Sequence, residues 1–127
     1  MKVLALDYGS ARTGVAVSDP TGTLARPLCT IQRAASEEGF ARLRELIRDE
    51  QPERIVVGLP LTLRGEIGAQ AEETNRFVEQ LRSAVDVPVE TFDERFTTTL
   101  AGPGIGDDAR AAAHLLSSYL ERSRSQT

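Results

Sequence analysis

The most restrictive feature of the sequence is a short, unbroken run of branched apolar residues, Ile55-Val56-Val57, which Gly58 and Pro60 end. A run of this length without a polar residue is typical of a strand that is buried on both faces. Strands of this kind occur in parallel sheets that helices cover on both sides. The chain is therefore predicted to fold as an α/β protein.

The first part of the chain predicts antiparallel strands. Residues 2–7 form an apolar run that ends in an aspartate, and residues 14–17 form a second run, so the two are expected to pair as a hairpin. A turn cluster at 19–23 follows. Residues 23–31 can then supply a third strand, with Pro27 at an edge or a bulge.

In the second part of the chain, helices alternate with strands. Ser36 is a suitable N-cap for a helix that should stop before Pro52, and apolar spacing predicts a second helix from about 67 to 84. The last strand is expected at 87–92, and a final helix opens at Asp108. The predicted order is βββαβαβα, which gives a mixed five-stranded sheet with helices on both faces.

Length and composition favour one soluble domain. The chain has 127 residues, of which 40% are hydrophobic, and no apolar run approaches the length of a membrane span. We expect a single domain over 1–122 and a short polar tail over 123–127. The apolar run at the N-terminus is too short for a secretory signal, and Cys29 has no partner for an internal disulfide. Both features predict a cytoplasmic protein without membrane contact.

The residue census limits the chemistry of any metal site. One histidine and one cysteine cannot build a zinc site or a paired Cys/His catalytic system. A metal site would therefore use oxygen ligands, which suit Mg²⁺ or Mn²⁺. The net charge of −4 argues weakly against a nucleic-acid partner, although arginines gathered on one face could still surround an acidic centre.

Acidic residues follow two of the predicted strands. If the strands at 2–7, 55–57 and 87–92 run parallel, Asp7 and the pair Asp93-Glu94 lie at the same edge of the sheet, where open α/β sheets bind ligands. Two-metal hydrolysis of a phosphodiester requires carboxylates that converge from separate elements. These residues are therefore candidate ligands.

Each acid also has a purely structural interpretation. An aspartate such as Asp7 commonly opens a tight turn, and Asp93-Glu94 can be solvated loop charges. Asp108 is a preferred type of helix cap, as is its neighbour Asp107. Asp19 is expected to form the turn at 19–22 rather than to bind a metal.

Four segments together resemble the motifs of the YqgF/RuvX family, in the same order and spacing and over nearly the whole chain. They are Asp7-Tyr8-Gly9-Ser10 with Gly14-Val15-Ala16-Val17-Ser18-Asp19, Gly58-Leu59-Pro60-Leu61 with Gly65, Asp93-Glu94-Arg95-Phe96-Thr97-Thr98, and Asp108-Ala109-Arg110-Ala111-Ala112 with Tyr119-Leu120-Glu121.

The resemblance implies a ribonuclease H-like fold and a metal-dependent endonuclease. Its implied substrate is pre-16S rRNA, trimmed at the 5′ end, or alternatively a four-way DNA junction, which a resolvase cuts. Asp7, either Asp93 or Glu94, and Asp108 are the implied catalytic residues and metal ligands, with Glu94 preferred over Asp93. The working form is a monomer or a homodimer.

Other residues of these motifs are candidates for nucleic-acid binding. Arginine side chains in or near the motif loops can hold phosphate oxygens or pair with the acids, and threonines after the last strand can contact a nucleic-acid backbone or cap a helix. These residues are Arg12, Arg64, Arg95, Thr97 and Thr98. The family usually carries a longer, often basic stretch where this chain has only Thr99 to Asp107, in which Gly102-Pro103-Gly104-Ile105-Gly106 is uncharged. The electrostatic grip on phosphate is therefore expected to be weakened or moved elsewhere.

Two other functions are compatible with parts of the sequence. An Asp-x-Gly after a first strand also opens the nucleotide-binding folds of actin and sugar kinases, but those proteins have two lobes and this chain has room for one. A non-catalytic RNA-binding module would keep the fold without the need for all three acidic positions.

Overall fold

The computed structural model describes residues 1–61, 64–94 and 108–125, and of 124–125 the backbone alone. The elements are β1 (Val3–Asp7), β2 (Arg12–Ser18), β3 (Ala25–Gln32), α1 (Glu37–Glu50), β4 (Arg54–Leu59), α2 (Ala69–Ala84), β5 (Val89–Asp93) and α3 (Asp108–Ser125). The predicted order βββαβαβα is confirmed. None of the helices in these ranges is both long enough and apolar enough to cross a membrane.

The five strands form one mixed sheet in the order β3-β2-β1-β4-β5. β1 and β2 pair antiparallel, as do β2 and β3, whereas β4 runs parallel to both β1 and β5. The carboxyl ends of β1, β4 and β5 therefore lie at the same edge. Pro27 lies in the edge strand β3, next to an irregularity in the pairing between Val15 and Ala16, as the sequence predicts.

Helix boundaries follow the capping signals closely. The Ser36 hydroxyl accepts a hydrogen bond from the Gly39 amide at 3.1 Å, and Gln51 adopts a left-handed conformation just before Pro52. α2 starts at Ala69, two residues later than expected. α3 continues to Ser125, so residues 123–125 of the expected polar tail extend the helix.

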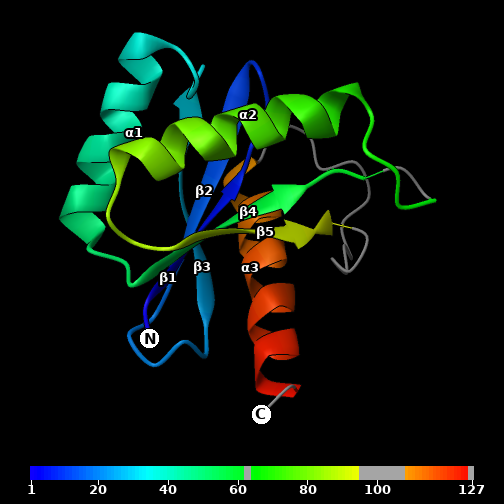
Figure 1. Ribbon diagram of the computed structural model, residues 1–127. Coiled ribbons are helices and arrows are strands. Elements are labelled where there is room, and N and C mark those ends of the chain that lie inside the picture. The colour runs from blue at the N-terminus through cyan, green and yellow to red at the C-terminus, as the bar shows by residue number, and fades with distance from the viewer. Residues whose placement is uncertain (62–63, 95–107, 126–127) are drawn as a thin grey trace.

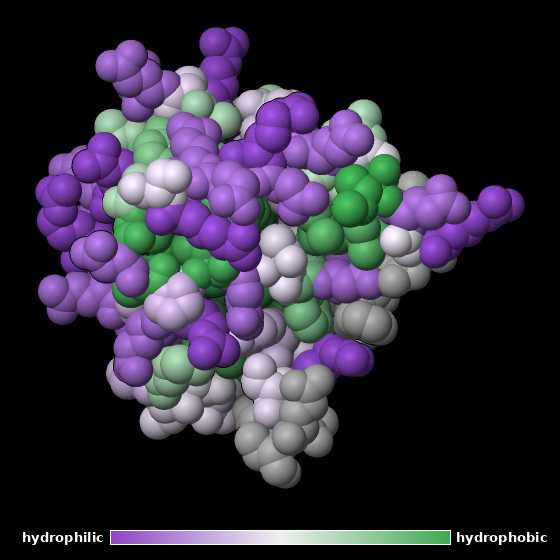
Figure 2. Space-filling view, in the orientation of Figure 1, coloured by the Kyte–Doolittle hydropathy of each residue, from purple (hydrophilic) through white to green (hydrophobic). Residues whose placement is uncertain are grey.

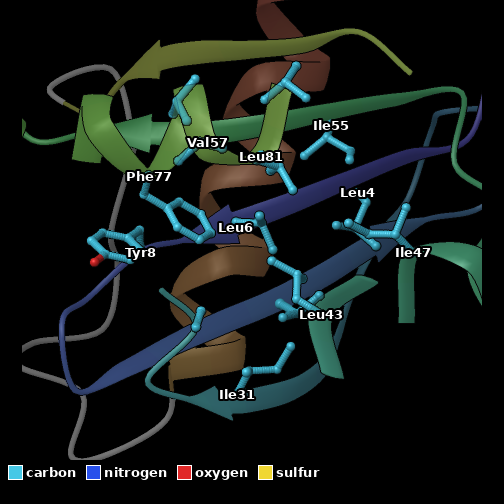
Figure 3. Packing of buried hydrophobic residues seen from close by; sticks show 14 of the residues in the cluster. Leu4, Leu6, Tyr8, Ile31, Leu43, Ile47, Ile55, Val57, Phe77 and Leu81 are labelled. Carbon is cyan, nitrogen blue, oxygen red and sulfur yellow. The ribbon is translucent and has the colours of Figure 1, made fainter. Parts of the chain in front are cut away.

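The sheet separates two apolar clusters, with α1 and α2 on one face and α3 on the other (Figure 1). β1 contributes side chains to both clusters, because successive side chains of a strand point to opposite faces. Leu4 and Leu6 join the α1/α2 cluster, which Figure 3 shows, while Val3 and Ala5 join the α3 cluster. Figure 2 shows hydrophilic side chains over most of the α1/α2 side, with hydrophobic ones visible in the gaps.

Candidate active site

Asp7 ends β1 on the face that α3 covers. Val3 and Ala5 pack in the α3 cluster, and the period of two along the strand gives Asp7 the same direction. Its side chain is half-buried, and across the β1–β2 ladder its partner is Gly14. The carboxylate therefore lies at the end of the sheet, between the sheet and the start of α3.

Glu94 reaches Asp7 from the end of β5. Its carboxyl forms a hydrogen bond with the carboxyl of Asp7, and it lies over Gly58 of β4. A Cβ atom at position 58 would come within 2.5 Å of Glu94 Oε1 and 2.9 Å of Glu94 Cγ. The glycine thus leaves the space that the Glu94 side chain occupies between β4 and α3.

Asp108 begins α3 directly above β2. A Cβ atom at position 14 would overlap the backbone carbonyl of Asp108, so Gly14 is what allows the first residue of α3 to lie against the sheet. Because Gly14 pairs with Asp7 in the ladder, this contact also brings Asp108 close to Asp7. The charge of Asp108 acts on the Asp7 carboxyl.

Arg12 supplies a positive charge to this group of acids. Its Nε atom lies 3.1 Å from Asp108 Oδ2, and the side chains of Arg12 and Asp108 are 53% and 25% exposed. An ion pair this open to solvent contributes little stability. Its exposure instead leaves the guanidinium free to exchange the carboxylate for another anion.

The electrostatics of the Asp7–Glu94 contact favour a shared proton. Burial raises the pKa of Glu94 to about 8, and the charge of Asp7 and the hydrogen bond with it act in the same direction. Burial also raises the pKa of Asp7, against the hydrogen bond from Glu94, which lowers it. Two carboxyl groups in contact cannot both ionise without a cation between them, so near neutral pH the pair retains one proton.

The remaining predicted site residues are distributed around this centre. Asp93, the neighbour of Glu94, lines a separate pocket with Arg54 and Tyr119. Arg64 is exposed in the loop after β4 and forms no ion pair within the described residues. Arg95, Thr97, Thr98 and the segment 99–107 lie outside the described residues.

Asp19 has the structural role that the sequence predicts. Its Oδ1 atom accepts hydrogen bonds from the amides of Thr23 at 2.8 Å and Leu24 at 2.9 Å, and its Oδ2 accepts one from the Thr21 hydroxyl. These hydrogen bonds hold the pKa of Asp19 well below its ordinary value. The carboxylate closes the β2–β3 turn and takes no part in the acidic centre.

Donor chemistry at the centre suits a hard divalent cation, because Asp7, Glu94 and Asp108 offer carboxylate oxygens only. In the ranges that the structure describes, however, no three acidic, histidine or cysteine side chains are arranged as a ready-made metal site. In the metal-free protein, the proton retained by Asp7 and Glu94 and the ion pair between Arg12 and Asp108 balance part of the negative charge of the three acids. A bound cation would balance the same charge.

Two glycines that were not predicted as site residues allow the three acids to come together. Gly14 was recognised only as part of a motif, and Gly58 as part of a motif and as the end of a strand, whereas β4 continues to Leu59. Each glycine occupies a strand position at which a side chain would collide with the main chain of Asp108 or the side chain of Glu94. The available signal was a glycine inside an otherwise apolar strand, which often marks a close approach.

Comparison with known proteins extends this description. The family model for RuvX, described as a Holliday junction resolvase, matches residues 1–122. A protein of Roseiflexus sp. (strain RS-1) is 49% identical over 100 residues, which are 79% of this chain and 71% of the relative. A protein of Chloroflexus aurantiacus is 42% identical over 135 residues, which cover 97% of this chain and 88% of the relative. Both carry the name "Putative pre-16S rRNA nuclease".

Among solved structures, Thermus thermophilus RuvC in complex with a Holliday junction substrate superposes with a TM-score of 0.62. The identity is 19%, and the match covers 100% of this chain and 97% of RuvC. A likeness at this identity establishes the fold, which is ribonuclease H-like. The alignment of 135 residues with the Chloroflexus relative is longer than the chain of 127, so this chain is the shorter one within the matched region.

Proposed function

The chain belongs to the RuvX family and is a nuclease, and from that premise we propose that it hydrolyses phosphodiester bonds of pre-16S rRNA at the centre formed by Asp7, Glu94 and Asp108. The observation that carries this proposal is the contact between the Asp7 and Glu94 carboxyl groups, with Asp108 beside them at the carboxyl ends of parallel strands. Ligands of open α/β sheets bind at this edge.

We assign the same three carboxylates to the binding of Mg²⁺ or Mn²⁺. Two such ions, when bound, activate a water molecule and stabilise the leaving oxygen. The raised pKa values support this assignment, because a cation between Asp7 and Glu94 removes the repulsion that otherwise retains a proton. Glu94 is preferred to Asp93 because it is the residue that contacts Asp7.

Arg12 has a separate task in this proposal. Its guanidinium neutralises Asp108 in the free protein, and it stands at the rim of the centre with half of its side chain in solvent. If Asp108 held a cation instead, the guanidinium would be available to hold a phosphate oxygen of the substrate. Arg64 and the residues Arg95, Thr97 and Thr98 are further candidates for contacts with the nucleic-acid backbone.

Pre-16S rRNA is ranked first as the substrate because the relatives that match most of this chain bear the name of a pre-16S rRNA nuclease. The chain would act in the cytoplasm, and its nuclease domain would span residues 1–122. It would cut near one end of the precursor as a monomer. An enzyme of this kind needs only one active site per cut.

The second candidate is a four-way DNA junction. It is supported by the description of the matching family and by the junction bound to Thermus RuvC. Symmetric resolution of a junction requires two active sites on opposed strands, and for a chain with one site this means a two-fold homodimer. The oligomeric state in solution therefore separates the two candidates.

The test is a cleavage assay of the purified chain on a precursor rRNA fragment and on a four-way DNA junction, with each of Mg²⁺, Mn²⁺ and Ca²⁺. We expect cleavage with Mg²⁺ or Mn²⁺ and none with Ca²⁺, whose longer bonds and looser shell suit paired-metal chemistry poorly. Mass in solution is measured on the same sample. A stable dimer that makes paired nicks in junctions and ignores RNA would reverse the ranking of substrates.

Asp7→Asn tests the site within this assay. Loss of a metal-binding carboxylate removes several kcal/mol of transition-state stabilisation, so cleavage should fall about a thousandfold or more while the fold is retained. Asp49→Asn, which makes the same change on the exposed face of α1, is the matched control and should cut normally. Full activity of Asp7→Asn would refute the assignment. If the wild-type protein cleaved nothing and Asp7→Asn bound RNA as tightly or more tightly, the chain would instead be a non-catalytic RNA-binding module.

A further inference from the structure

A second pocket lies at the end of β1, on the face of the sheet opposite to the acidic centre. It has a volume of about 330 Å³ and is lined by Tyr8, Gly9, Ser10, Ala69, Gln70 and Glu73. These residues come from the β1–β2 turn and from the first two turns of α2. Its size is at the lower end of the range for small-molecule pockets, which is sufficient for one nucleobase.

The aromatic wall of the pocket is fixed in place by the α1/α2 core. The ring of Tyr8 stacks on Phe77 with 4.4 Å between the ring centroids, and Figure 3 shows its oxygen at the outer edge of this core. The Tyr8 hydroxyl donates a hydrogen bond of 2.9 Å to Glu73 Oε2. The carboxylate of Glu73 is therefore held at the pocket by a side chain that is itself rigidly packed.

Several polar groups of the pocket have unused hydrogen-bonding capacity. Within the described ranges, Glu73 accepts only the bond from Tyr8, and neither the amide of the Gln70 side chain nor the Ser10 hydroxyl forms a hydrogen bond. No side chain caps the start of α2, so the amides of its first turn are also open. Acceptors and donors thus stand together around one aromatic wall.

The open amides at the start of α2 alone would attract an anion, but the Glu73 carboxylate beside them makes the pocket better suited to a base than to a phosphate. The negative charge of Glu73 repels an anion, whereas its open Oε1 atom accepts from an N–H group. Gln70 can donate and accept at once, as recognition of a base edge requires. An aromatic wall with a few convergent polar groups is the usual setting in which a protein reads an unstacked base.

We propose that this pocket binds a nucleobase that carries an exocyclic amino group, taken from a nucleotide next to the scissile bond. The inference rests on the proposed nuclease function, because Tyr8 directly follows Asp7 and the pocket and the acidic centre therefore lie at the same end of β1. Consecutive Cα atoms are about 3.8 Å apart. A single strand of nucleic acid that crosses the end of β1 would therefore meet the acidic centre and the pocket within a few nucleotides. Glu73 is the specificity-determining residue.

Cytosine and uracil give the sharpest comparison. At the same ring position cytosine presents an amino group, which donates to Glu73, and uracil presents a carbonyl oxygen, which the carboxylate repels. The experiment measures binding of fluorescein-labelled hexauridine, and of hexamers with a single C, A or G at each internal position, by fluorescence anisotropy in EDTA, where no cleavage occurs. At one position, an amino-bearing base should tighten binding about tenfold.

Two variants assign the preference to the pocket. Glu73→Gln should lose it, because the amide that replaces the carboxylate can also donate to the uracil carbonyl. Glu72→Gln removes the same charge from the neighbouring exposed position of α2 and should keep it. Equal binding of all hexamers, no binding of any of them, or a preference that survives in Glu73→Gln would overturn the proposal. Cleavage of precursor RNA by the same sample, with metal added, shows whether the proposed function stands when this inference fails.

Discussion

The two faces of the sheet are built by different rules. The α1/α2 face is filled by large side chains, among them Phe40, Leu43 and Phe77, that interlock in one cluster. The α3 face has its own packed cluster, which includes Leu116 and Tyr119. At its acidic end, however, glycines replace side chains, so that backbone approaches backbone at Gly14 and Glu94 fits over Gly58. Both faces therefore contribute packing energy, and only the α3 face also supplies the close approach that brings three acids together.

Gly14→Ala should give the largest effect, because it forces a side chain into the backbone of Asp108, which cannot rotate away. We expect a loss of about 4 kcal/mol or more in the free energy of unfolding, together with loss of cleavage. Chemical denaturation and the cleavage assay measure the two effects. If the variant were as stable as the parent, α3 would not lie against β2 as described.

Leu43→Ala breaks the opposite face. Leu43 is fully buried in α1, and truncating such a side chain costs about 3 kcal/mol through lost burial and the cavity that remains. Cleavage per folded molecule should be unchanged, because α1 packs on the face of the sheet opposite to α3 and the acidic centre. Denaturation midpoints and turnover at a temperature where the variant is folded test the prediction, and a selective loss of turnover would contradict the division between the faces.

Gly58→Ala separates site geometry from packing. The added methyl group meets two side chains, Glu94 and the buried Leu115, whose Cδ2 atom would lie 3.0 Å away, rather than backbone. Stability should fall by only about 1 kcal/mol, because both side chains can shift, whereas displacement of the Glu94 carboxylate should slow cleavage about a hundredfold. Unchanged turnover in a stable variant would show that Glu94 is not needed at the position that the structure gives it.

The smallest effect concerns pH and the metal-free protein. The pKa of Glu94 is raised from an ordinary value of 4.5 to about 8 in the fold, so this group favours the folded state below pH 4.5 and ceases to do so as the pH rises to 8. The melting temperature in EDTA should fall over this range. In Glu94→Gln the fall should be smaller. Asp19 titrates below this window and does not interfere. An equal fall in both proteins would argue against the shared proton.

Much of the fold could be predicted from sequence because its signals are local. The apolar run at 55–57 indicated a buried parallel strand, Ser36 and Pro52 marked the ends of α1, and Pro27 indicated the edge strand. The end of α3 could not be placed in this way, since residues 123–125 are polar and no glycine or proline stops the helix there. The start of α2 was predicted two residues too early, because Gly68 is a weak cap and marks the boundary poorly.

The candidate site was less predictable, because its geometry depends on tertiary contacts. The parallel strands placed Asp7 and the Asp93-Glu94 pair at one edge, but only the fold shows that Glu94 is the one that meets Asp7. The ion pair between Arg12 and Asp108 joins residues 96 positions apart and had no local signal. The pocket beside Tyr8 likewise combines a turn and a helix that are distant in the chain.

Binding of Mn²⁺, followed by electron paramagnetic resonance without any substrate, tests whether Glu94 is a metal ligand at the acidic centre. We expect that wild-type protein binds Mn²⁺, that Glu94→Gln weakens this binding at least about tenfold, and that Asp93→Asn, the same kind of change one residue earlier, has little effect. Contradictory results would be a loss of binding in Asp93→Asn with none in Glu94→Gln, or equal binding by all three proteins.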